Sequence, residues 1–359
     1  MDPRPFPTDG PYCIGETAFH HQGSESDLHS IIEAVAESGC HAVKFHLLLD
    51  LDDYMVKAHP AHATIKQWLF DADTWEKAIG FARNKGLDVV LLCNDRLAAH
   101  TALERGWNAR GVEVHATGIN DLLLLRAFAA LPGTVILGVG GCTLNEIQVA
   151  VNALRSMGKK EIMLMHGFQN YPTDPNEIRL SRMERLRDLF RLPVGYADHT
   201  APEDEDHAPL AACAAMMGVN VLEKHITPWP GQQRIDHQAA IGVDKMQEVI
   251  RLMKRMWTMR SGDPLTFSPA EERYGATGPM KKAIVASRVI PKGKVLSLED
   301  LAYKRTGRTE RVSQDRLPML LGAQALRDIA PDEAIVLDAL ALADTPAGME
   351  HFFINNKDR

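Results

Sequence analysis

Eight short apolar runs, each rich in Val, Ile and Leu, recur along the first part of the chain. They lie at residues 12–17, 41–48, 87–93, 111–116, 134–139, 161–167, 192–198 and 219–225. Runs of this length with little polar alternation are typical of parallel strands that are buried on both faces. The pattern therefore predicts eight strands in the core of an α/β domain.

Stretches with the apolar spacing of amphipathic helices separate these runs. Clear examples lie at residues 27–39, 71–86, 144–158 and 177–190, and a longer one lies at 244–262. Several of them end in glycine, which favours the end of a helix. Strand and helix alternating eight times over about 250 residues predict a closed (β/α)8 TIM barrel, since a doubly wound sheet usually needs fewer strands.

The pattern changes after residue 262. Residues 263–279 are rich in Pro, Gly and charge, as is typical of a linker. Residues 280–345 contain short β-like runs with tight turns, which predict a small β-rich domain. Residues 346–359 have the composition of a tail. We therefore expect a catalytic TIM-barrel domain at 1–262 and a smaller domain after the linker.

Composition and charge narrow the class of protein. The chain has 359 residues and 45% hydrophobic content, enough for one full-sized core and a smaller one. Its formal net charge is -7 and it has no dense basic run, so we expect no nucleic-acid partner. It has neither a signal-like apolar N-terminus nor an apolar run near the roughly 20 residues of a membrane span, so we expect a cytoplasmic protein without membrane contact. Scattered cysteines predict reduced thiols in the core: Cys13, Cys40, Cys93, Cys142 and Cys213.

Polar side chains gather where the predicted strands end. Ten of them lie at or just beyond the ends of seven strands: Glu16, Lys44, His46, Arg96, His115, His166, Asp198, His199, Glu223 and His225. Catalytic groups of a (β/α)8 barrel occupy this end, so we expect these side chains to converge on one mouth. His199 and His225 end neighbouring strands, and Asp198 could orient a histidine ring or cap the following helix.

Four segments resemble one known family. Residues 165–200, 221–226 and 234–240 resemble the sialic acid synthases, in the motifs "GYADHT", "VLEKHI" and "RIDHQAA". Residues 289–307, "VIPKGKVLSLEDLAYKRTG", resemble the C-terminal antifreeze-like (SAF) domain of that family. The resemblance extends in the right order over nearly the whole chain, and it implies a TIM barrel followed by a SAF domain.

The resemblance also implies an activity. Members of the family condense phosphoenolpyruvate with an open-chain N-acetylated amino sugar to form a 2-oxo sugar acid, and they act as domain-swapped homodimers. A divalent metal, commonly manganese or magnesium, is held by the histidines that match His199 and His225. A metal acts as a Lewis acid on the aldehyde oxygen, and imidazole ligands suit manganese or zinc better than magnesium. We therefore expect Mn²⁺, with Mg²⁺ or Zn²⁺ as alternatives.

Further roles follow from matching positions. Glu16, Glu223 and Tyr171 are the candidate catalytic residues, because either carboxylate could move a proton or position a water. Candidate substrate-binding residues are Lys44, Arg96, Gln169, Asp236 and Arg305. The resemblance implies that Arg305, in "YKRTG", reaches across the dimer to the bound sugar.

The chain departs from the family where phosphate is expected to bind. Glu113 stands where a second lysine is usual, while Gly138 and Ala197 replace serines. Gln169 replaces an Asn or Glu, and Lys44 is the family cation that is kept. A carboxylate facing a phosphate would repel it, so phosphoenolpyruvate as donor is in question.

Two observations bear on this departure. Arg96 stands where an aromatic residue is common and could supply a replacement cation. Glu113 could point away from the mouth, because a shift of one residue in strand register turns a side chain to the opposite face of the sheet. His20, His46 and His115 stand where other residues are expected. They could bind a second metal or a differently shaped sugar, or they could be solvated residues of the rim.

The function expected from the sequence is a metal-dependent condensation of a three-carbon donor with an amino sugar. One alternative is a divergent metal-dependent 2-oxo-acid aldolase or lyase that does not use phosphoenolpyruvate. Another is a sugar-binding homologue without turnover. The joint retention of seven residues argues against it: Glu16, Lys44, Tyr171, His199, Glu223, His225 and Asp236.

Overall fold

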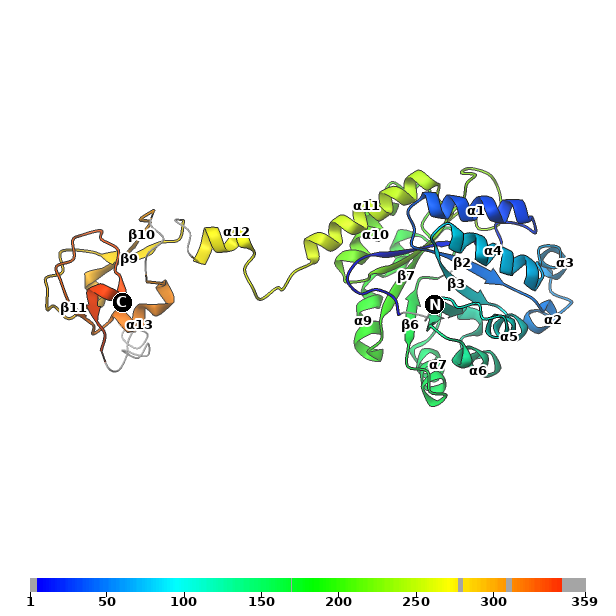
Figure 1. Ribbon diagram of the computed structural model, residues 1–359, viewed down its shortest axis with the longest axis horizontal. Helices are drawn as coiled ribbons and strands as arrows, with labels where there is room; N and C mark the ends of the chain where they lie inside the picture. Colours follow the sequence, from blue (N-terminus) through cyan, green and yellow to red (C-terminus); the bar gives the residue numbers. More distant parts are fainter. Residues whose placement is uncertain (1–4, 169, 277–279, 308–311, 344–359) are drawn as a thin grey trace. The chain divides into compact units, whose positions relative to one another are not determined.

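A computed structural model describes residues 5–168, 170–276, 280–307 and 312–343. The chain divides into two compact units, residues 1–261 and 262–359 (Figure 1). The predicted boundary at residue 262 lies one residue from this division. Within the described residues, no helix combines the length and the apolar character that a membrane crossing requires.

The first unit is a closed barrel of eight parallel strands in sequence order, in which β1 pairs with both β2 and β8. The strands are β1 (Tyr12–Glu16), β2 (Ala42–Leu47), β3 (Asp88–Cys93), β4 (Gly111–Val114), β5 (Thr134–Gly138), β6 (Ile162–His166), β7 (Val194–Asp198) and β8 (Val221–His225). Each lies within one of the eight apolar runs of the sequence. The predicted TIM barrel is therefore confirmed.

Helices surround the barrel (Figure 1). They are α1 (Glu25–Glu37), α2 (Leu51–Tyr54), α3 (His62–Lys66), α4 (Ala72–Asn84), α5 (Arg96–Glu104), η1 (Ala116–Gly118), α6 (Leu122–Ala130), α7 (Leu144–Ser156), α8 (Pro175–Ile178), α9 (Ser181–Phe190), α10 (His207–Met216) and α11 (Val243–Arg260). α1, α4 and α7 each end two residues before the glycine that was predicted to end them, and Gly39, Gly86 and Gly158 have left-handed φ angles of 81°, 83° and 85°. The single helix predicted at 177–190 is instead two, because Arg179 takes a left-handed φ of 51° between them.

The barrel interior has an apolar lower layer and a polar upper layer. Alternate residues of a strand face the barrel interior. On β1 the side chains of Ile14 and then Glu16 face it, and on β8 those of Val221 and then Glu223. The apolar layer consists of Phe6, Tyr12, Ile14, Ala42, Val90, Ile136, Met163, Met165, Ala197 and Val221. This layer closes the interior beneath the polar residues, which lie at the carboxyl ends of the strands.

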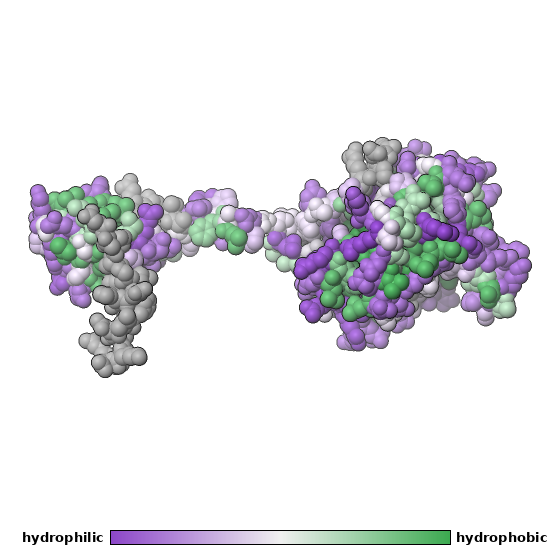
Figure 2. All heavy atoms as spheres, turned by 90° about the horizontal axis from the view of Figure 1, so that it is seen from below, coloured by the Kyte–Doolittle hydropathy of each residue, from purple (hydrophilic) through white to green (hydrophobic). Residues whose placement is uncertain are grey.

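The face of the barrel unit drawn in Figure 2 carries patches of hydrophobic residues among hydrophilic ones. The large exposed side chains of α6 and α7 include Leu122, Leu123 and Leu144, which are 58%, 50% and 50% exposed. Exposed leucines of this kind are ordinary, because apolar atoms contribute a large part of the accessible surface of folded proteins.

The second unit has its own small core, formed by Ile284, Ile290, Leu296, Leu320, Ile335 and neighbouring side chains. Its strands pair antiparallel, β9 (Ala283–Ala286) with β10 (Leu301–Lys304) and β11 (Gln324–Ala325) with β12 (Leu340–Ala341). Its helical segments are α12 (Pro269–Glu271), η2 (Glu272–Ala276), η3 (Leu298–Asp300), η4 (Gln314–Arg316), α13 (Leu317–Leu320) and η5 (Leu337–Ala339). Part of the predicted linker is thus helical. The predicted tail, residues 346–359, lies outside the described residues.

Candidate active site

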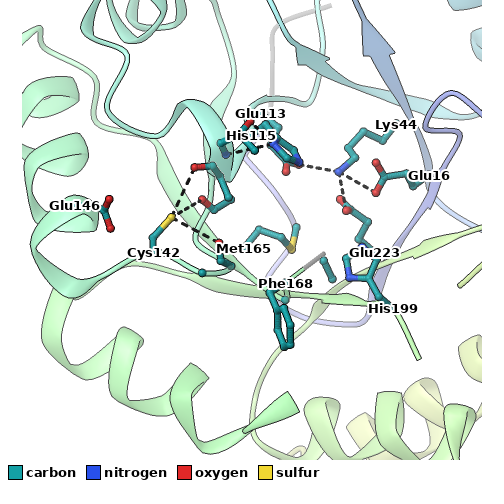
Figure 3. A pocket seen from close by; sticks show the side chains of 17 residues that line it. Glu16, Lys44, Glu113, His115, Cys142, Glu146, Met165, Phe168, His199 and Glu223 are labelled. Carbon is teal, nitrogen blue, oxygen red and sulfur yellow. Dashed lines mark hydrogen bonds and ion pairs between the residues drawn. The ribbon is translucent and has the colours of Figure 1, made fainter. Parts of the chain in front are cut away.

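Lys44 lies at the centre of a buried cluster of carboxyl groups (Figure 3). Its Nζ is 3.0 Å from Glu16 Oε2, 3.0 Å from Glu113 Oε2 and 2.6 Å from Glu223 Oε1. The four side chains come from β2, β1, β4 and β8, and each is at most 5% exposed. Glu113 therefore points into the barrel, toward the lysine.

The pairing of the strands brings these groups together. Glu16 is paired with Lys44 on β2 and with His225 on β8. Because β1 lies between these two strands, the residues occupy the same level of the barrel. Sequence positions separated by about two hundred residues thus meet through the closure of the sheet.

The carboxyl groups of the cluster differ in their protonation. Burial alone would raise the pKa of Glu16, but Lys44 and then His225 and His46 outweigh it and hold this pKa well below its usual value. Burial raises the pKa of Glu113, and burial together with Glu16 raises the pKa of Glu223 well above its usual value. Two kinds of carboxyl group, one ionised and one that readily holds a proton, suit acid–base chemistry.

His199 and His225 lie side by side next to this cluster, with ring centroids 5.3 Å apart. His199 Nδ1 and His225 Nε2 are buried and make no hydrogen bond. Burial lowers the pKa of His199 to about 4 and that of His225 well below its usual value, so both rings are neutral at neutral pH. Tyr171 packs edge-on against both rings, at 5.3 Å and 5.7 Å between centroids.

The histidine pair fits a divalent metal ion through its two unpartnered ring nitrogens. Among the residues that the structure describes, no group of three or more His, Cys, Asp or Glu is arranged as a metal site.

Asp198 braces the strand ends that carry the two histidines. This carboxylate is fully buried and lies 2.8 Å from Lys224 Nζ, next to His225. It also accepts hydrogen bonds from the Thr200 backbone at 2.9 Å and hydroxyl at 2.8 Å. These contacts fix the residues that adjoin both histidines.

A pocket of about 340 Å³ opens above the cluster (Figure 3). Its lining residues are Glu16, Lys44, Glu113, His115, Ala116, Thr117, Gly138, Gly140, Gly141, Cys142, Glu146, Met165, Gly167, Phe168, Ala197, His199 and Glu223. The lining holds four glutamates, one lysine and no arginine. A buried carboxylate cluster beside two neutral imidazoles, at the mouth of a TIM barrel, is suited to an enzyme of small polar substrates.

Comparison with known families agrees with this geometry. The family model described as "NeuB family" matches residues 31–263, which is more than half of the chain. The chain belongs to the NeuB family.

Relatives with curated names match over nearly their full length. The chain is 28% identical to the N,N'-diacetyllegionaminic acid synthase of Campylobacter jejuni, over 90% of this chain and 98% of the relative. It is 25% identical to the spore coat polysaccharide biosynthesis protein SpsE of Bacillus subtilis, over 93% and 95%. A solved structure, a putative spore coat polysaccharide biosynthesis protein E from Chromobacterium violaceum, has the same fold, with a TM-score of 0.79 at 19% identity over 92% of this chain and 99% of that one. The resemblance to sialic acid synthases is thereby confirmed, and with it an enzyme that forms carbon–carbon bonds.

Among the predicted residues of this NeuB-family chain, Arg96 lies apart from the cluster. Arg96 begins α5 and binds Asp53, with Nε 3.0 Å from Oδ1, and its side chain is 46% exposed. It is absent from the described residues that line the pocket. Arg305 belongs to the second unit, where its guanidinium contacts Met280 Sδ at 2.7 Å. Gln169 lies outside the described residues.

Asp236 lies in the loop after β8 and is half-buried. Burial raises its pKa to about 6. His20 holds this loop, because its ring nitrogens lie 2.7 Å from the Ile235 carbonyl and 2.8 Å from Thr227 Oγ1. His20 therefore holds the backbone next to Asp236.

The other two unexpected histidines adjoin the site. His46 forms a short contact with Glu16 and belongs to the cluster. His115 lines the pocket and bonds Thr117 Oγ1 at 2.8 Å, and burial lowers its pKa to about 4. The sequence did not single out Phe168, Met165 or Cys142, which also line the pocket. Glycine-rich loops after two strands were the available signal for this part of the wall.

Proposed function

We propose that this protein condenses a three-carbon donor with the open-chain form of an amino sugar, in an aldol-type reaction that gives a 2-oxo sugar acid of the sialic acid type. The observation that supports it is the pair of unpartnered histidines beside the Glu16–Lys44–Glu223 cluster, in a chain of the NeuB family. Phosphoenolpyruvate or a related three-carbon acid is the donor.

In this proposal His199 and His225 hold a divalent ion, Mn²⁺ before Mg²⁺ or Zn²⁺. When bound, the ion supplies Lewis-acid polarisation of the aldehyde oxygen. This assignment is supported by two buried imidazoles in which His199 Nδ1 and His225 Nε2 make no hydrogen bond. Asp198 keeps both rings in place through its bonds to Lys224 and Thr200.

The remaining residues of the site bind substrates and move protons. Glu223 is the proton donor, because its raised pKa favours the protonated form, and Glu16 stays ionised beside Lys44. Tyr171 packs on the histidines and borders the reacting groups. Substrate contacts are proposed for Lys44, Arg96, Gln169, Asp236 and Arg305.

The partners in this proposal are small molecules and a second copy of the chain. A sugar and a three-carbon acid are the substrates, in a cytoplasmic domain-swapped homodimer. The second unit is proposed to be a SAF domain. What supports this assembly is the family resemblance of residues 289–307 and the length of the segment at 263–279.

A turnover assay tests the proposal. The purified protein with Mn²⁺ is given phosphoenolpyruvate, and separately pyruvate, with a panel of N-acetylated sugars, and both phosphate and 2-oxo sugar acid are measured. The wild type should form product, and the His199→Ala/His225→Ala variant should form none and should bind less metal by elemental analysis. Product formation at an unchanged metal content in the double variant would contradict the metal assignment, and lack of product with every pair would contradict the condensation.

A second candidate is a 2-oxo-acid aldolase or lyase that does not use phosphoenolpyruvate. The contact of Glu113 with Lys44 favours it, because this carboxylate lies where a phosphate-binding cation is expected. A sugar-binding homologue without turnover has less support, since the cluster keeps groups of contrasting protonation.

A further inference from the structure

The side chains that line the pocket offer little positive charge to a phosphate group. Lys44 is the only lysine among its described lining residues, and arginine is absent from them. Three carboxyl groups already lie within 3.0 Å of Lys44 Nζ. A substrate anion would therefore have to share Lys44 with three carboxyl groups.

Burial strengthens the electrostatic effect of this shortage of cationic side chains. The four side chains are 2–5% exposed, so water scarcely screens them. A phosphate dianion brought against Glu113 would meet a carboxylate where binding requires a cation, in a medium of low effective dielectric constant. A three-carbon acid with one carboxylate brings less charge into the same space.

Two of the residues that line the pocket are small. Gly138 and Ala197 line the pocket and offer no hydroxyl group to a phosphate. A Cβ on Gly138 would lie 3.5 Å from Glu113 Oε1 and 3.0 Å from the Ala116 backbone nitrogen. Glu113 Oε1 therefore borders the pocket beside this glycine.

We infer that the donor is a 2-oxo acid of pyruvate type without a phosphate, and that Glu113 is the residue that takes a proton from its methyl carbon. This inference rests on the proposed condensation and names its donor. Phosphoenolpyruvate is already an enol derivative and needs no such base, whereas a 2-oxo acid must lose a C3 proton before it can attack an aldehyde.

The reaction balances without an additional reactant. The Glu113 carboxylate takes the C3 proton, the C–H electron pair forms the C2–C3 double bond, and the 2-oxo oxygen gains charge. The C3 carbon then attacks the aldehyde carbon, the new carbon–carbon bond forms, and the alkoxide receives the proton from Glu113. Burial raises the pKa of Glu113, which strengthens it as a base for this step.

A partial reaction tests the inference without knowledge of the acceptor sugar. The protein with Mn²⁺ is incubated with pyruvate in D₂O, with and without the sugar panel, and deuterium in the methyl group is measured by mass spectrometry. Wild type should exchange the methyl protons faster than protein-free Mn²⁺, and Glu113→Gln should lower this rate by about a hundredfold or more. Circular dichroism establishes that the variant is folded.

Glu271→Gln is the matched control. Glu271 does not line the pocket, and its carboxylate accepts a hydrogen bond from the Ser268 backbone at 2.8 Å and caps α12, which glutamine can also do. Its exchange rate should stay at the wild-type value.

The alternative outcomes separate this inference from the proposed function. Phosphate release from phosphoenolpyruvate with product formation, while pyruvate stays unexchanged, would overturn the inference and leave the condensation intact. Exchange that is equal in wild type and folded Glu113→Gln would overturn the role of Glu113. Absence of both exchange and product with either donor would overturn the inference and the proposed function together.

Discussion

The ammonium group of Lys44 on β2 lies within 3.0 Å of carboxyl groups from three other strands. Its removal would leave these three buried carboxyl groups without a cation. We expect Lys44→Met to lower the free energy of unfolding by roughly 3–5 kcal/mol, because a buried charge is left uncompensated. Urea denaturation measures this loss. A second substitution, Glu113→Gln, should recover part of it by removing one of the carboxylates.

Lys85→Met is the control for this prediction. Lys85 pairs with Glu33 at 2.9 Å on the surface, with both side chains well exposed. Because water screens such a pair, its loss should cost less than about 1 kcal/mol. Equal losses for Lys44→Met and Lys85→Met would show that the cluster is not stabilised by the lysine.

Asp236 gives a stability effect that depends on pH. Its pKa is raised from 3.8 to about 6 by burial, so the folded protein binds its proton more tightly than the unfolded chain does. Below about pH 4 the group is protonated in both states, whereas above pH 6 the fold must hold a buried carboxylate. Stability should therefore fall between pH 4 and pH 6, by about 3 kcal/mol in total.

Asp236→Asn removes the contribution of this carboxyl group to the pH dependence of stability. Asparagine does not titrate and tolerates the left-handed φ of 59° at this position. The variant should gain stability relative to wild type as pH rises from 4 to 7, in urea denaturation at each pH. A difference between the two proteins that is the same at both ends of this range would contradict the assignment.

The sequence predicted which residues lie at strand ends, but not where each side chain points. Glu113 and Arg96 both lie near the carboxyl end of a strand. The side chain of Glu113 nevertheless points to Lys44, whereas that of Arg96 turns outward to Asp53. The direction of Glu113 depends on the pairing of β4 with Leu92 on β3 and Ile136 on β5, which is a property of the closed barrel. Such non-local register is not encoded in the local apolar pattern.

At the scale of elements, the strands were predicted well because burial on both faces gives them a strong apolar signal. The helix at 177–190 was predicted less well. Its apolar spacing continues through Arg179, and only the backbone of that residue reveals the break. A non-glycine residue in the left-handed region carries no reliable signal in the sequence.

The loops after β5 and β6 touch each other beside the active site. A Cβ on Gly140 would lie 2.0 Å from the Gly167 carbonyl oxygen and 2.6 Å from Phe168 Cα. We expect Gly140→Ala to push apart the two loops, with loss of both stability and product formation. Urea denaturation and the turnover assay measure these losses.

Gly80→Ala provides the comparison within another element. Gly80 lies inside α4, and a Cβ there has open space around it. The substitution should stabilise the protein by about 0.5–1 kcal/mol, because alanine favours a helix over glycine. If Gly140→Ala also stabilised the protein, the close contact between the two loops would not require glycine at this position.

At the scale of the whole molecule, each unit has a core of its own. The second unit is small, and its buried Asp300 is bound by Arg288 at 2.9 Å and by Ser297 through backbone and hydroxyl at 3.0 Å. The segment that precedes it is long enough to permit exchange of this unit between two copies of the chain. Arg305 lies in this unit directly after β10.

We predict that Arg305 of the partner subunit completes the sugar site of each barrel, since a guanidinium can bind sugar oxygens by paired hydrogen bonds. Arg305→Ala and His199→Ala should each be inactive alone. Mixed after subunit exchange, they should regain partial activity, because one site in each mixed dimer would then combine an intact His199 with an intact Arg305. Mass spectrometry of differently tagged chains measures the exchange. Exchanged mixtures without recovered activity would mean that Arg305 serves its own chain or only stabilises its unit.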